Sequence, residues 1–175
     1  MTLSRREALA RGGALAALAA LPAAVRADGP VIVAMKGAGG GARVWFSPAG
    51  LAVAPGTTIR FVNEDAGNSH TATAYAPAID GRQLRIPPEA APWDSDYLLP
   101  GETFEVTLAA PGVHDYYCRP HEMAGMVGRI VVGRPGDPGF ADAAADSGDL
   151  PDAALAAFPA VEEILAQGRV EGGPG

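Results

Sequence analysis

A cysteine, a histidine and a methionine stand close together in the sequence, at Cys118, His121 and Met126. Their spacing, Cys-x2-His-x4-Met, places a thiolate, an imidazole and a thioether within one short segment. This mix of soft and borderline donors suits copper that cycles between Cu(II) and Cu(I) better than zinc, calcium or magnesium. A second histidine is required, and His70 can supply it from 48 residues upstream. The spacing therefore predicts a site for one copper ion.

These four side chains also indicate what such a site could do. His70, Cys118 and His121 are expected to form a trigonal plane, with Met126 as a long axial ligand. Because this set is a compromise between two oxidation states, little has to move when an electron arrives or leaves. Four protein donors leave no open position for a substrate or a metal-bound water, which disfavours hydrolysis. We expect an electron carrier and not an enzyme.

Cys118 is the only cysteine, so the chain cannot form an internal disulfide. Taken alone, it could be an inert buried thiol or could form a bridge to another molecule. Its neighbours His121 and Met126 favour the metal-binding interpretation.

The elements around these residues are predicted to be short strands separated by Pro and Gly turns. In the segment 57–63 (TTIRFVN), Ile59 and Phe61 fall on one face, as expected for a strand that covers a core. We expect an all-β fold, a Greek-key sandwich or barrel of about seven to eight strands. Residues 76–99 contain four prolines and are predicted to be a long ordered loop. The expected strands cover 30–35, 44–46, 51–53, 57–63, 70–75, 102–108, 113–118 and 128–132.

Residues 1–27 have the features of an export signal: the basic pair Arg5-Arg6, a short apolar run and a small-residue cleavage site before Asp28. The pair resembles a twin-arginine signal, and an uncleaved N-terminus that anchors the protein to a membrane is the alternative. We expect an exported, periplasmic or extracytoplasmic monomer. Its main domain is predicted at 28–133, followed at 134–175 by an acidic, poorly ordered linker and one short helix over 159–167.

The net charge indicates which classes of partner are expected. Removal of residues 1–27 takes away four arginines and one glutamate, which changes the formal net charge from −7 to −10. Phosphate binding requires a basic surface, so we expect no nucleic-acid partner. An acidic surface instead favours a basic partner or a salty medium.

Two segments resemble the cupredoxins, the blue-copper family that includes plastocyanin, pseudoazurin and the halocyanins. They are Tyr117-Cys118-x-Pro120-His121 with Gly125-Met126-Val127-Gly128, and Asn68-Ser69-His70-Thr71. The resemblance implies that His70, Cys118, His121 and Met126 are the copper ligands, so neither His114 nor Met123 is assigned. It also implies that redox proteins dock transiently at the exposed edge of His121. Residues 76–99 and the segment after 133 depart from the family pattern.

Other functions remain open at this point. A copper oxidase or nitrite reductase domain would need further histidine clusters, and only His114 is left over. A non-redox copper-binding or storage protein could use the same ligands if water or Glu122 replaced the axial methionine. A metal-free interaction module is disfavoured because all four donors are present. Asn63 and Asn68 could tether the ligand loops through their side-chain amides.

Overall fold

Strand β4 (Thr57–Asn63) shows how the alternating sequence pattern builds the fold. Ile59, Phe61 and Asn63 are buried, while the residues between them are partly exposed. Such alternation places one face of a strand against a core and the other toward solvent. The computed structural model describes residues 29–173, so the predicted export signal at 1–27 lies outside the described residues.

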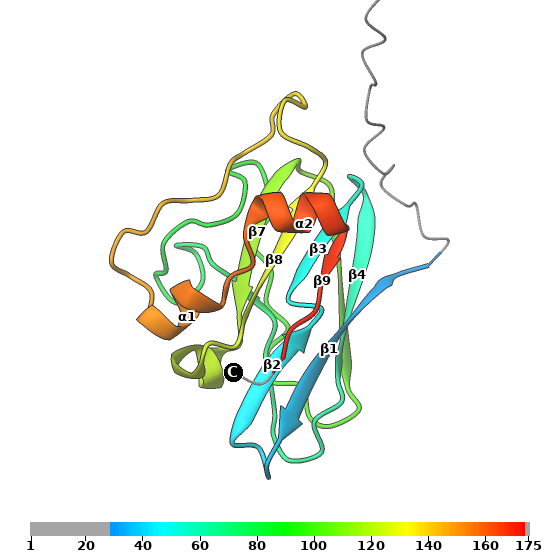
Figure 1. Cartoon of the computed structure of the whole chain (residues 1–175), viewed down its shortest axis with the longest axis vertical. Coiled ribbons are helices and arrows are strands. Elements are labelled where there is room, and N and C mark those ends of the chain that lie inside the picture. Colours follow the sequence, from blue (N-terminus) through cyan, green and yellow to red (C-terminus); the bar gives the residue numbers. More distant parts are fainter. Residues whose placement is uncertain (1–28, 174–175) are drawn as a thin grey trace, which may run out of the picture.

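The strands form two packed sheets, as expected for a Greek-key sandwich (Figure 1). One sheet has the order β2-β1-β4-β6 and the other the order β5-β7-β8-β3-β9. The pairs β1–β4 and β3–β8 are parallel, and the remaining pairs are antiparallel. Besides β4, the strands in residues 29–173 are β1 (Val31–Ala38), β2 (Arg43–Ser47), β3 (Gly50–Val53), β5 (Thr73–Ala74), β6 (Thr103–Leu108), β7 (Gly112–Tyr117), β8 (Val127–Val132) and β9 (Arg169–Val170).

Aromatic side chains fill the space between the sheets. The ring of Tyr116 packs edge-on against Phe46 and Phe61, with centroid distances of 4.8 and 5.2 Å. Gly128 on the neighbouring strand makes room for it, because a Cβ there would lie 2.3 Å from the Tyr116 ring. These contacts fix the ends of β7 and β8, which carry the predicted metal loop between them.

Two irregular segments also position the predicted metal loop. A short 3₁₀ helix, η2 (Arg119–Ala124), connects β7 to β8 and ends at Gly125 in the left-handed conformation. Residues 76–99 form the predicted loop and contain only isolated bridges, such as the one between His70 and Leu98. That bridge brings the loop alongside the chain around His70.

The C-terminal segment contains more structure than the sequence indicates. The expected helix is present as α2 (Val161–Gln167), and α1 (Asp152–Ala157) precedes it. Helix α2 lies across β3 and β8, while α1 lies beside η2 (Figure 1). Ile164 of α2 is fully buried with Val113 and Val131. The short, Ala-rich α1 has no side-chain cap, which leaves little signal in the sequence.

Charged contacts hold the segment before α1, which was expected to be a poorly ordered linker. Asp149 accepts hydrogen bonds from the Gln83 backbone and from Arg82 in the 76–99 loop. The Gln83 side chain also donates to the carbonyl of Ala145. The division of the chain at residue 133 stays a prediction. Within residues 29–173, no helix has the length and apolar character needed to cross a membrane.

Candidate metal centre

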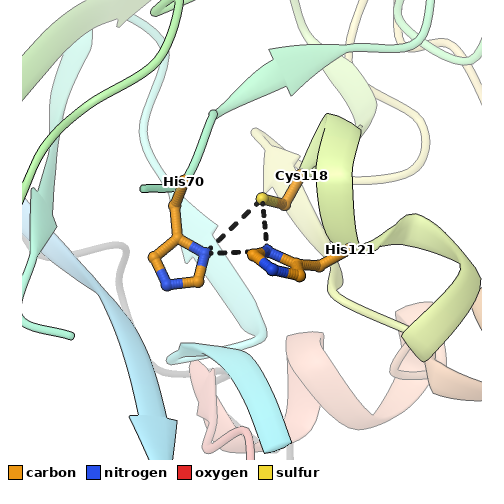
Figure 2. A group of neighbouring side chains, drawn as sticks. All are labelled: His70, Cys118 and His121. Atoms are coloured by element: carbon orange, nitrogen blue, oxygen red, sulfur yellow. Dashed lines mark hydrogen bonds between the residues drawn. The ribbon is translucent and has the colours of Figure 1, made fainter. Parts of the chain in front are cut away.

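Three predicted ligands point toward one another (Figure 2). His70 Nδ1 lies 3.1 Å from His121 Nδ1, and Cys118 Sγ lies 3.6 and 3.4 Å from these two nitrogens. The point in their plane that is equally distant from all three atoms lies about 2.0 Å from each. Imidazole nitrogen and thiolate sulfur bind a metal such as zinc at a similar distance, roughly 2.0–2.3 Å. The three atoms are therefore spaced to share one ion.

The backbone on both sides of His70 is held by the 76–99 loop. The His70 and Leu98 backbones exchange two hydrogen bonds, of 3.1 and 2.8 Å. The Asn63 amide donates to the carbonyls of Asn68 and Leu98, at 2.9 Å each. Asn63 thus tethers the ligand loop as expected, and His70 itself is fully buried.

Cys118 follows the last residue of β7 and is also fully buried. Burial raises the pKa of its thiol to about 12, and hydrogen bonds from Thr71 and His121 act in the opposite direction. The Thr71 backbone N–H donates to the sulfur at 3.3 Å. A metal that binds the thiolate must therefore displace a proton from this buried site.

His121 lies in η2 and is partly exposed. Its backbone N–H donates to the Cys118 carbonyl at 3.0 Å, which folds the Cys-x2-His turn back on itself. Burial lowers the pKa of His121, and the nearby His70 lowers it further. Burial also lowers the pKa of His70, although Asp65 opposes this shift. Both rings are thus disposed to be neutral, which is the form that binds metals.

Met126 is fully buried, in the same core cluster as Cys118. Its backbone N–H donates to the His121 carbonyl, and its carbonyl accepts from the Cys118 N–H. Met123, in contrast, is 77% exposed. The remaining histidine, His114, does not belong to the metal-binding group of the described residues and donates from Nε2 to the Ala110 carbonyl. A ligand role for Met126 stays a prediction.

The charged residues of η2 are paired with the 76–99 loop, a feature that sequence reasoning missed. Glu122 accepts two hydrogen bonds from Arg82, at 2.7 and 2.8 Å, and one from Tyr75 at 2.6 Å. Arg119 forms ion pairs with Asp80 and Asp94, at 2.7 Å each. The metal loop is therefore clamped from outside the sheets.

Asp65 is a second residue that the sequence interpretation missed. It accepts a hydrogen bond at Oδ2 from His70 Nε2, at 3.0 Å. Asp65 stands five residues before His70 in a polar run, NEDAGNS, which resembles an ordinary turn. The only available signal was a carboxylate near a predicted ligand, and the ring nitrogen that faces away from a metal commonly donates to such a group.

Known proteins resemble this chain in sequence and fold. The model of copper-binding proteins of the plastocyanin/azurin family matches residues 33–133, which include all four predicted ligands. The chloroplastic plastocyanin of Chlamydomonas reinhardtii is 41% identical over 130 residues, or 74% of this chain and 83% of that protein. The one from Oryza sativa subsp. indica is 36% identical over 133 residues, or 73% and 80%. A solved Sinorhizobium pseudoazurin has a TM-score of 0.55 and 31% identity, and the match covers 79% of this chain and 94% of that one.

Proposed function

The chain belongs to the plastocyanin/azurin family of copper-binding proteins, and we propose that it carries single electrons between redox proteins. Its cofactor is one copper ion, which supplies one-electron exchange between Cu(II) and Cu(I). The observation that supports this role is the convergence of two imidazole nitrogens and one thiolate sulfur on a common point.

His70, Cys118 and His121 would hold the copper ion, and Met126 would be a fourth, weaker donor. The backbone hydrogen bonds that join Met126 to Cys118 and His121 support its place at the site. Four side chains as ligands would leave the ion no open position for a substrate or a water. This argument favours an electron carrier over an enzyme.

The surface around His121 supports transient docking of a partner. Pro120, Met123 and Ala124 are exposed beside the partly exposed His121. The charged side chains of η2 are held by the 76–99 loop and not by this surface, because Arg119 and Glu122 form ion pairs with that loop. The result is a small apolar cap, and a small interface suits the weak, short-lived contact of an electron-transfer pair. Electrons would enter and leave through the His121 edge.

The proposed carrier works outside the cytoplasm as a monomer. This part of the proposal depends on the export signal at residues 1–27, with cleavage after Ala27 or retention as a membrane anchor. The formal charge of −10 after cleavage favours a partner with a basic docking surface.

One equivalent of Cu(II) added to the chain from residue 28 to 175 tests the proposal. We expect an intense visible band from sulfur-to-copper charge transfer, narrow copper hyperfine splitting in the electron paramagnetic resonance spectrum, and reversible bleaching by ascorbate. Cys118→Ser should abolish the band, whereas the matched control His114→Gln should retain it. A pale protein with wide hyperfine splitting would mean that copper binds without the thiolate, as in a storage protein, and an unchanged band in Cys118→Ser would refute the ligand assignment.

A further inference from the structure

Asp65 is a buried carboxylate that accepts hydrogen bonds from three N–H groups. It is 6% exposed and accepts from the Gly67 backbone at 2.8 Å and from the Asn68 amide at 2.7 Å. His70 is its third hydrogen-bond donor, with Nε2 and Oδ2 separated by 3.0 Å. Its neighbour Glu64, in contrast, is at the surface and pairs with Lys36. The Asp65 charge is therefore directed toward the metal centre.

This contact determines which nitrogen His70 offers to a metal. A carboxylate oxygen accepts the hydrogen bond, so the proton of the neutral ring is on Nε2. Nδ1 then keeps its lone pair, and Figure 2 shows Nδ1 of His70 facing Cys118 and His121. The other ring nitrogen points away from them, toward the position that Asp65 occupies.

The fold makes room for this carboxylate. A Cβ on Gly37 of β1 would lie only 2.0 Å from Asp65 Oδ2, so a side chain there would displace it. A Cβ on Gly41 would likewise lie 2.4 Å from the Asn68 amide. The Asp65 backbone N–H donates to Asn63, whose amide also holds the His70 loop. The carboxylate is thus built into the site and is not a surface charge that happens to lie nearby.

We propose that Asp65 is a positioning residue that orients His70 and, through its negative charge, favours Cu(II) over Cu(I). The inference rests on the proposed ligation of copper by His70. A fixed negative charge stabilises the more positive of two states, and it does so more strongly in a buried site than in water. A carboxylate bound to the outer nitrogen also raises the basicity of a ligating imidazole. Both effects lower the reduction potential.

The reduction potential of the copper-loaded protein tests this role. Asp65→Asn keeps the size of the side chain and an oxygen acceptor but removes the charge. We expect the ratio of Cu(II) to Cu(I) affinity to fall at least tenfold, which corresponds to a potential about 59 mV higher. The matched control Glu64→Gln removes an exposed charge next to it and should change the ratio less than threefold. An unchanged or lower potential in Asp65→Asn would overturn the inference.

Two other outcomes of this experiment have a defined meaning. If the unmodified protein shows no sulfur-to-copper band, the proposed function fails before Asp65 is tested. If Asp65→Asn does not fold, nuclear magnetic resonance of the unmodified protein with diamagnetic Cu(I) replaces it. We then expect a His70 Nε2 proton that exchanges slowly with water, with Nδ1 bound to the metal. A proton on Nδ1, or an Nε2 proton that exchanges freely, would refute the role of Asp65.

Discussion

Replacement of Arg82 by Met is expected to weaken the support of the metal loop from the 76–99 loop. Arg82 donates to both carboxylate oxygens of Glu122, at 2.7 and 2.8 Å. Only 15% and 11% of these two side chains are exposed. The substitution would leave the Glu122 charge nearly buried, with the Tyr75 hydroxyl as its remaining donor.

The size of the effect follows from this burial. Removal of one partner from a buried ion pair costs about 3–5 kcal/mol, and the slight exposure of this pair places Arg82→Met near about 3 kcal/mol. Arg82 also contacts Asp149 and lies over the rings of Tyr75 and Tyr117, so the single substitution removes more than the pair with Glu122. Glu122→Gln leaves the Asp149 contact intact, and the double variant has no buried unpaired charge. The two losses of unfolding free energy should therefore sum to at least about 1 kcal/mol more than the loss in the double variant.

Urea unfolding of the copper-loaded single and double variants measures this coupling. Arg60→Met is the matched control, because it breaks the pair with Glu105 on the surface, where the side chains are 41% and 45% exposed. Exposed pairs contribute less than about 1 kcal/mol, so this control should remain close to the unmodified protein. If the losses of unfolding free energy in Arg82→Met and Glu122→Gln were additive, or if Arg82→Met lost no more than the control, Arg82 would not support the metal loop.

Two further predictions concern the C-terminal segment and the pH dependence. Ile164→Ala should lower the unfolding free energy by about 3 kcal/mol, because Ile164 is fully buried against the sheet; a loss under about 1 kcal/mol in urea unfolding would show that α2 does not dock. His114→Gln should make the unfolding free energy less sensitive to a fall in pH. Burial lowers the His114 pKa below its ordinary 6.5, so the unfolded chain takes up a proton first and stability is lost as pH falls from 6.5 through the folded pKa. Between about pH 6.5 and 5.5 the copper-loaded variant should lose up to about 1 kcal/mol less than the unmodified protein, and equal losses would contradict this cause.

The strands and the pair Cys118 and His121 could be predicted because their signals are local. Alternation identifies β4, and the structure confirms the inward positions of Ile59 and Phe61. The spacing of Cys118 and His121 follows from one turn, which the backbone bond between them closes. The distant His70 was assigned from donor chemistry and from the family resemblance, and the comparisons confirm the family.

The ion pair that Glu122 of η2 forms with Arg82 could not be predicted, because it joins residues far apart in sequence. Arg82 and Glu122 are 40 residues apart, and neither is unusual in its local context. The place of Asp65 depends on the missing side chain of Gly37, which the parallel pairing of β1 with β4 brings close. Helix α1 was missed for another reason: its six residues are too few for a clear period.

The two ligand loops are held by different chemistry but by the same segment. Hydrogen bonds from Leu98 and Asn63 fix the backbone around His70. Ion pairs to Arg82 and Asp94 fix η2, which carries His121. Residues 76–99 thus contact both sides of the metal centre although none of them is a proposed ligand, which gives this segment a physical role. The proposed electron carrier needs ligands that stay in place in both oxidation states, so we expect substitutions in this loop to alter electron transfer while the proposed ligands remain intact.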